Sequence, residues 1–106
     1  MEKQILPEIK NPEVLQKAID RFGYRTQSDM AIEEMSELTK ALLKHRRGCP
    51  SGTVNDLRRL RENIVEETAD VIVMIAQMIM MYDYRGDVQA EVDFKINRLR
   101  ERLKEG

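Results

Sequence analysis

Apolar residues recur at intervals of three and four along most of the chain, which is the spacing of one face of an α-helix. This periodicity predicts four helices, at about residues 12–22, 27–46, 54–83 and 88–104. Each predicted start has a residue type that favours helix initiation: Asn11 with Pro12, Thr26, Thr53 and Asp87. Residues 1–10 lack this periodicity and form an N-terminal extension. We therefore expect residues 1–106 to be one all-α domain, folded as a four-helix antiparallel bundle that oligomerisation completes.

One carboxylate interrupts the apolar stripe of the third predicted helix. On a helical wheel, Glu67 falls within about 40° of Leu60, as do Ile64 and Val71, on the arc that should face the core. Asp70 lies at the edge of the same arc. Because a buried carboxylate is costly unless it is paired with a cation or binds a metal, Glu67 needs a partner.

The second predicted helix repeats this arrangement. Glu34 falls among Leu38 and Ala41 on its apolar arc, and Glu37 lies at the edge. If the two helices pack antiparallel, four carboxylates converge: Glu34, Glu37, Glu67 and Asp70. Their mutual repulsion would be relieved by a hard divalent cation, and an all-oxygen ligand set favours Mg²⁺ or Mn²⁺. Acidic patterns are also common on solvated helix faces, but two clusters that both lie on apolar arcs favour a functional site.

The two acidic segments, Glu33-Glu34-x-x-Glu37 and Glu66-Glu67-x-x-Asp70, resemble the paired signature of the all-α NTP pyrophosphohydrolases. That superfamily includes MazG-like proteins, dimeric dUTPases and dCTP pyrophosphatases. The resemblance extends over about residues 27–103, and the small size is most similar to the compact MazG-like members. It implies a Mg²⁺-dependent hydrolase that cleaves nucleoside triphosphates between the α and β phosphates, releasing a nucleoside monophosphate and pyrophosphate. A house-cleaning role is compatible with that activity.

The resemblance also implies roles for individual residues. The metal ligands would be Glu34, Glu37, Glu67 and Asp70. Glu33 or Glu37 would orient or deprotonate the attacking water. Glu66 would lie next to the metal ligands without binding the metal directly. Lys95 is the expected phosphate contact on the last helix, with Arg98 and Asn97 behind it. Apart from the resemblance, Gln27 lies two turns before Glu34 on the same arc of its helix and could contact the base. The dCTP-type enzymes have a lysine four residues before the asparagine, where this chain has Asp93, so the match is imperfect. The alternative is a solvated helix face for these cations and a buried or rim amide for Gln27.

Composition narrows the expected partners and the expected cellular location of the protein. The 106 residues carry a net charge of −1, so no overall basic field favours nucleic acid. The longest apolar run is too short to cross a bilayer, and no signal peptide is recognisable, so a membrane is not an expected partner. Cys49 is the only cysteine, which favours a reducing, cytoplasmic location. Three arginines open the third helix and could attract phosphate or simply be solvated: Arg58, Arg59 and Arg61.

Apolar residues outside the core arcs predict a further buried surface. Ile32, Leu43 and Phe94 lie away from the stripes of their helices, so we expect a homodimer or a dimer of dimers. Two other functions remain open. The chain could be a non-enzymatic helical oligomer whose carboxylates form structural ion pairs, or a carboxylate-bundle enzyme for another phosphorylated substrate. The preferred base does not follow from the sequence.

Overall fold

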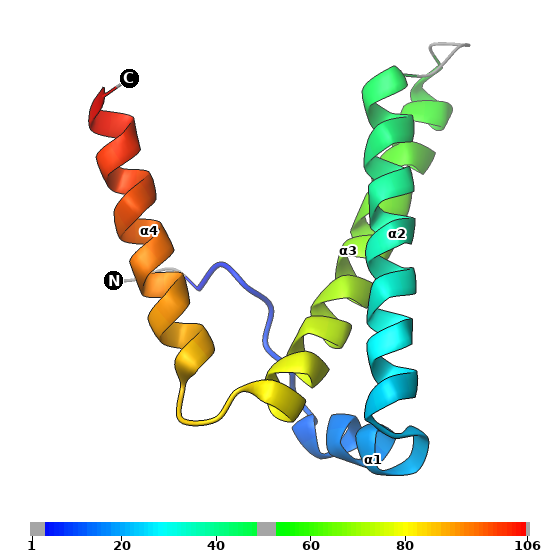
Figure 1. Cartoon of the computed structure of the whole chain (residues 1–106). Helices are drawn as coiled ribbons and strands as arrows, with labels where there is room; N and C mark the ends of the chain where they lie inside the picture. Colours follow the sequence, from blue (N-terminus) through cyan, green and yellow to red (C-terminus); the bar gives the residue numbers. More distant parts are fainter. Residues whose placement is uncertain (1–3, 49–52, 106) are drawn as a thin grey trace.

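All regular secondary structure is helical in the computed structural model, which describes residues 4–48 and 53–105. The elements are α1 (Pro12–Phe22), α2 (Tyr24–Arg47), α3 (Val54–Tyr82) and α4 (Asp87–Glu105), shown in Figure 1. The predicted all-α class and the four helices are confirmed. None of the helices in these described ranges is long and apolar enough to span a membrane.

The helix boundaries show which initiation signals operate. The Thr53 side chain caps α3 and accepts a hydrogen bond from the backbone N–H of Asp56 at 3.2 Å, as predicted. The predicted cap at Thr26 is wrong, because α2 begins directly after Gly23. Gly23 has φ +89°, a conformation that glycine adopts without strain, so one residue ends α1 and starts α2. Asp87, the predicted cap of the last helix, is the first residue of α4 itself. The Asp83 side chain instead accepts a hydrogen bond from the backbone N–H of Val88 at 3.0 Å.

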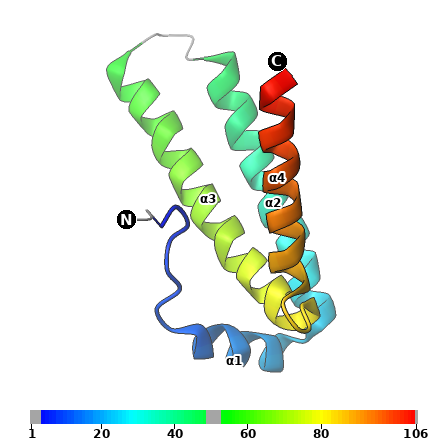
Figure 2. The same ribbon diagram turned by 90° about the vertical axis from the view of Figure 1, so that its left-hand side faces the viewer.

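Helices α2 and α3 form an antiparallel hairpin, and α1 packs across the end of it near Gly23 (Figures 1 and 2). The buried apolar side chains come from all three helices: Leu15, Ile19, Ala31, Ala41, Val71, Met74 and Met81. Alanines on α2 let the α3 backbone approach closely, and Ala41 is only 1% exposed. The hairpin therefore holds the two acidic segments against each other along one seam.

Helix α4 stands apart from the hairpin. It has no buried residue, and Figure 1 shows it leaning away after the turn at Arg85 and Gly86. Its predicted apolar stripe is exposed throughout, and Leu99 keeps 51% of its surface accessible. The predicted helix exists, but the fourth member of the bundle is not packed within one chain, because the turn directs α4 away from the seam.

Candidate functional site

Three carboxylates meet midway along the seam. Glu34 comes from α2, while Glu67 and Asp70 lie three residues apart on one face of α3. One carboxylate oxygen from each residue lies within 4.8 Å of the other two. Glu34 and Glu67 are half-buried and Asp70 is exposed, so solvent can reach the group from one side. We call Glu34, Glu67 and Asp70 the carboxylate cluster.

The cluster concentrates negative charge without a cationic partner. Partial burial raises the pKa of Glu34, and Asp70 raises it further through its charge and a hydrogen bond. Partial burial also raises the pKa of Glu67, with additional repulsion from Asp70 and Glu37. The Glu67 Oε2 atom is buried and has no hydrogen-bond partner. No lysine or arginine in the described ranges pairs with the cluster, so a divalent cation would relieve both the repulsion and the unmet acceptor.

The fourth predicted ligand lies beside the cluster and not in it. Glu37 is half-buried and close enough to raise the pKa of Glu67. However, its carboxylate lies 3.9 Å from the ammonium of Lys40, one turn further along α2. Glu33 and Glu66 are exposed next to the cluster residues in sequence. Three of the four predicted ligands therefore meet, and Glu37 does not join them.

A hollow of about 290 Å³ adjoins the cluster on the side towards α1. It is lined by Phe22, Gln27, Met30, Glu34, Asp70, Val73, Met74 and Gln77, and we call it the amide hollow. Gln27 is 3% exposed, and its Nε2 donates a hydrogen bond to Gln77 Oε1 at 2.6 Å. The Gln27 Oε1 atom has no partner, so the hollow contains a buried hydrogen-bond acceptor that remains unsatisfied.

Gln27 thus lies beside the cluster, as its place on the α2 arc predicted. Gln77 was not predicted as a site residue. Its signal was an amide in the middle of the most apolar segment of α3, which requires a hydrogen-bond partner when buried.

The predicted phosphate contacts on α4 do not reach the cluster within one chain. Lys95, Asn97 and Arg98 are exposed, and Figure 1 shows their helix separated from the hairpin. The Arg98 guanidinium lies 6.0 Å from the centre of the Phe94 ring, and Asn97 Oδ1 accepts a hydrogen bond from Arg100 at 3.2 Å. Both contacts are local to α4, because the turn before it directs the helix away.

Comparisons of the chain with known protein families, with curated proteins and with solved structures found no match. Fold and site together define an all-helical protein with a three-carboxylate candidate metal site in a helical hairpin. A function must be argued from the chemistry of that site, since fold alone does not specify one.

Proposed function

We propose that this protein is a Mg²⁺-dependent hydrolase of nucleoside triphosphates, of the all-α NTP pyrophosphohydrolase type. The observation that carries the proposal is the meeting of Glu34, Glu67 and Asp70 within 4.8 Å across two helices. These residues belong to the two sequence segments that resemble the superfamily signature. Spatial convergence is what a shared metal site requires.

The residues of the cluster suit a hard cation. Glu34, Glu67 and Asp70 would hold Mg²⁺, or Mn²⁺, with Glu37 as a fourth ligand after a rotamer change. When bound, the metal would neutralise phosphate charge and lower the pKa of a coordinated water. Glu33 or Glu37 would orient or deprotonate the attacking water, and exposed Glu66 would contribute negative potential next to Glu67.

The surroundings of the cluster suit a nucleoside. The amide hollow offers apolar walls and the unsatisfied Gln27 Oε1, which could accept a hydrogen bond from a base N–H group. Because Gln27 is already oriented by Gln77, its acceptor would contribute to selection between bases.

We further propose a homodimer or a dimer of dimers. The exposed stripe of α4 would pack on a second copy and complete the four-helix arrangement there. In that arrangement Lys95, Arg98 and Asn97 could supply phosphate contacts to the neighbouring cluster.

Pyrophosphate release from a panel of dNTPs, with Mg²⁺ present, tests the activity. We expect Glu67→Gln to reduce kcat/KM by at least about 100-fold, because a metal ligand and a charge are lost together. The matched control is Asp29→Asn, which removes an exposed carboxylate from α2 and should leave the rate within about twofold. An unchanged rate in Glu67→Gln would refute the proposed site.

One observation favours a non-enzymatic alternative. A hydrogen bond between the Glu34 and Asp70 carboxyl groups could hold the hairpin without metal, because the raised pKa of Glu34 favours its protonated form. The chain would then be a structural helical oligomer. The dNTP panel separates these functions, since that alternative predicts no release of pyrophosphate from any nucleotide. Release of phosphate alone, from nucleotides or other substrates, would point to a different phosphohydrolase.

A further inference from the structure

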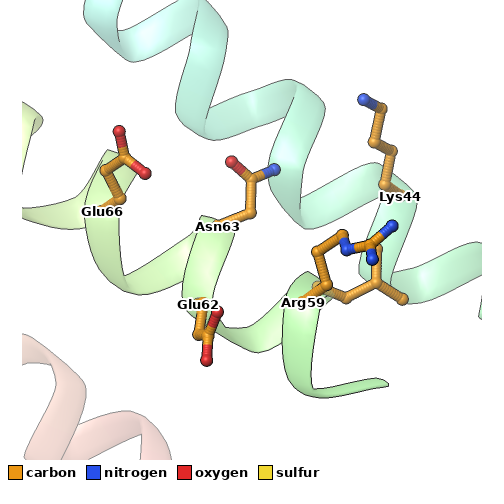
Figure 3. Close-up of a pocket in the computed structure, with 6 residues that line it drawn as sticks. Lys44, Arg59, Glu62, Asn63 and Glu66 are labelled. Atoms are coloured by element: carbon orange, nitrogen blue, oxygen red, sulfur yellow. The ribbon is translucent and has the colours of Figure 1, made fainter. Parts of the chain in front are cut away.

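A second hollow lies on the other side of the carboxylate cluster, towards the end of the hairpin that is remote from α1. It measures about 360 Å³ and is lined by Lys44, Arg59, Leu60, Glu62, Asn63 and Glu66. Figure 3 shows Lys44 and Arg59 at one end, Glu66 at the other and Asn63 between them. We call it the cationic hollow, because two unpaired cations line its outer end.

The two cations of this hollow have no ionic partner within residues 4–48 and 53–105. Neither Lys44 nor Arg59 forms an ion pair with any residue of the described ranges, although Glu62 and Glu66 line the same hollow. Figure 3 shows the Glu62 carboxylate pointing away from Lys44. A third cation, Arg47, lines an adjoining hollow that shares Lys44 and Leu60. A guanidinium and an ammonium from two facing helices can hold several oxygens of one phosphate group.

The cationic hollow follows the proposed metal site along α3, towards the start of that helix. Glu66, at its inner end, directly precedes Glu67 of the cluster. Arg59 lies eight residues before Glu67, about 12 Å along the axis of α3, and its guanidinium lies at the end of the hollow away from Glu66 (Figure 3). The amide hollow lies on the opposite side of the cluster and includes Glu34 and Asp70 in its wall. Amide hollow, cluster and cationic hollow therefore follow one another along the hairpin.

We infer that the cationic hollow binds the β and γ phosphates of the substrate, so that the nucleotide lies along the hairpin with its base towards Gln27. This inference rests on the proposed function. The reverse orientation would place a polyanion against the buried amides and an uncharged base against Lys44 and Arg59. Cations at this end would also assist the reaction. As the water oxygen bonds to the α phosphorus and passes one proton to Glu33 or Glu37, the anhydride P–O bond breaks. Its electron pair passes to the leaving pyrophosphate, whose growing charge Lys44 and Arg59 would stabilise.

Calorimetric titration with inorganic pyrophosphate tests the site without requiring catalysis. Wild type, Lys44→Gln and Arg59→Gln are compared with Arg58→Gln, which removes the same charge from the neighbouring exposed residue outside the hollow. Titrations are run with Mg²⁺ and with EDTA. We expect Lys44→Gln and Arg59→Gln each to weaken binding about tenfold or more with Mg²⁺, since charge-assisted hydrogen bonds are lost. Arg58→Gln should remain within about twofold of wild type, because Arg58 does not line the hollow.

Equal weakening by Arg58→Gln and Arg59→Gln would overturn the inference, because a diffuse positive field would then explain binding. Absence of pyrophosphate binding to wild type would overturn it as well. Hydrolysis assays separate the two proposals. Pyrophosphate binding that depends on Arg59, in a protein that hydrolyses no nucleotide, supports the anion site and refutes the proposed function. Nucleotide hydrolysis with an unchanged KM in Arg59→Gln supports the proposed function and refutes the assignment of the hollow.

Discussion

The α2–α3 hairpin and helix α4 have the same kind of amphipathic pattern and opposite structural outcomes. In the hairpin, apolar positions become a core in which Met74 is only 5% exposed. In α4, the same spacing yields no buried residue at all. Periodicity determines which side chains share a face of a helix, and it does not determine what that face packs against. The hairpin supplies its own partner, whereas no residue of α4 is buried within one chain.

The predicted site residues also fall into two groups, one on the packed helices and one on α4. The carboxylate cluster and both hollows are formed by packed helices, so their geometry is preorganised. Lys95, Asn97 and Arg98 lie on the unpacked helix and are not brought to the cluster. If the protein is an enzyme, one chain supplies the three carboxylates of the proposed metal site. Any contribution from α4 to that site would depend on a second copy.

The largest expected effect is on catalytic activity, and it compares a substitution in the hairpin with one in α4. We expect Asp70→Asn to lower kcat/KM for the preferred dNTP by at least about 100-fold, because it removes a proposed ligand. Lys95→Gln should lower it by about tenfold, because one charge-assisted phosphate contact is lost. Steady-state pyrophosphate release measures both. A larger loss in Lys95→Gln than in Asp70→Asn would show that the isolated helix, and not the hairpin, carries the chemistry.

A substitution in the hairpin core should also destabilise the protein more than a substitution in α4. We expect Met74→Ala to lower the free energy of unfolding by about 2–4 kcal/mol, since the side chain is buried between packed helices. Leu103→Ala, on a residue that is 75% exposed, should change it by less than about 0.5 kcal/mol. Urea titration of both variants provides the measurement. A loss of similar size in Leu103→Ala would mean that α4 is covered as fully as the hairpin core.

Sequence reasoning was most successful where the determinants are local. The helices, the Thr53 cap and the meeting of Glu34 with Glu67 follow from spacing along one or two adjacent helices. The Thr26 prediction was wrong because Gly23 can turn the chain in a single residue, which a search for side-chain caps overlooks. The position of α4 depends on two turn residues with positive φ, Arg85 and Gly86, whose conformation helix periodicity does not specify. Gln77 was missed because its role depends on what faces it across the seam.

Association should depend on the α4 stripe. We expect Leu99→Asp to weaken the proposed self-association by about tenfold or more, because it would place an unpaired charge in an apolar interface. Sedimentation velocity over a range of micromolar concentrations measures this. The control is Glu101→Ala, an exposed residue on the same helix. A stable wild-type monomer throughout that range would refute the oligomer.

The smallest expected effect concerns the pH dependence of stability in the metal-free protein. Glu34 and Glu67 have pKa values raised above the ordinary 4.5 by partial burial and by neighbouring carboxylates. The folded state therefore binds protons more tightly than the unfolded state. Stability should fall as pH rises from the ordinary glutamate pKa to the raised values, and the loss persists at higher pH.

Replacing Glu67 with glutamine removes its share of this loss. At pH 7 in EDTA, Glu67→Gln should therefore melt a few degrees above wild type, and the two should converge near pH 4. Mg²⁺ should reverse the order at pH 7, because a cation that binds only the folded cluster stabilises wild type by an amount that grows with the logarithm of its concentration above the Kd. Differential scanning calorimetry at both pH values, with and without Mg²⁺, measures these shifts. Asp29→Asn should follow wild type in each condition, since it leaves the cluster intact. If Mg²⁺ raised the Tm of Glu67→Gln as much as that of wild type, binding would occur elsewhere. The carboxylate cluster would then not be the metal site, and the hairpin would not differ from α4 in metal binding.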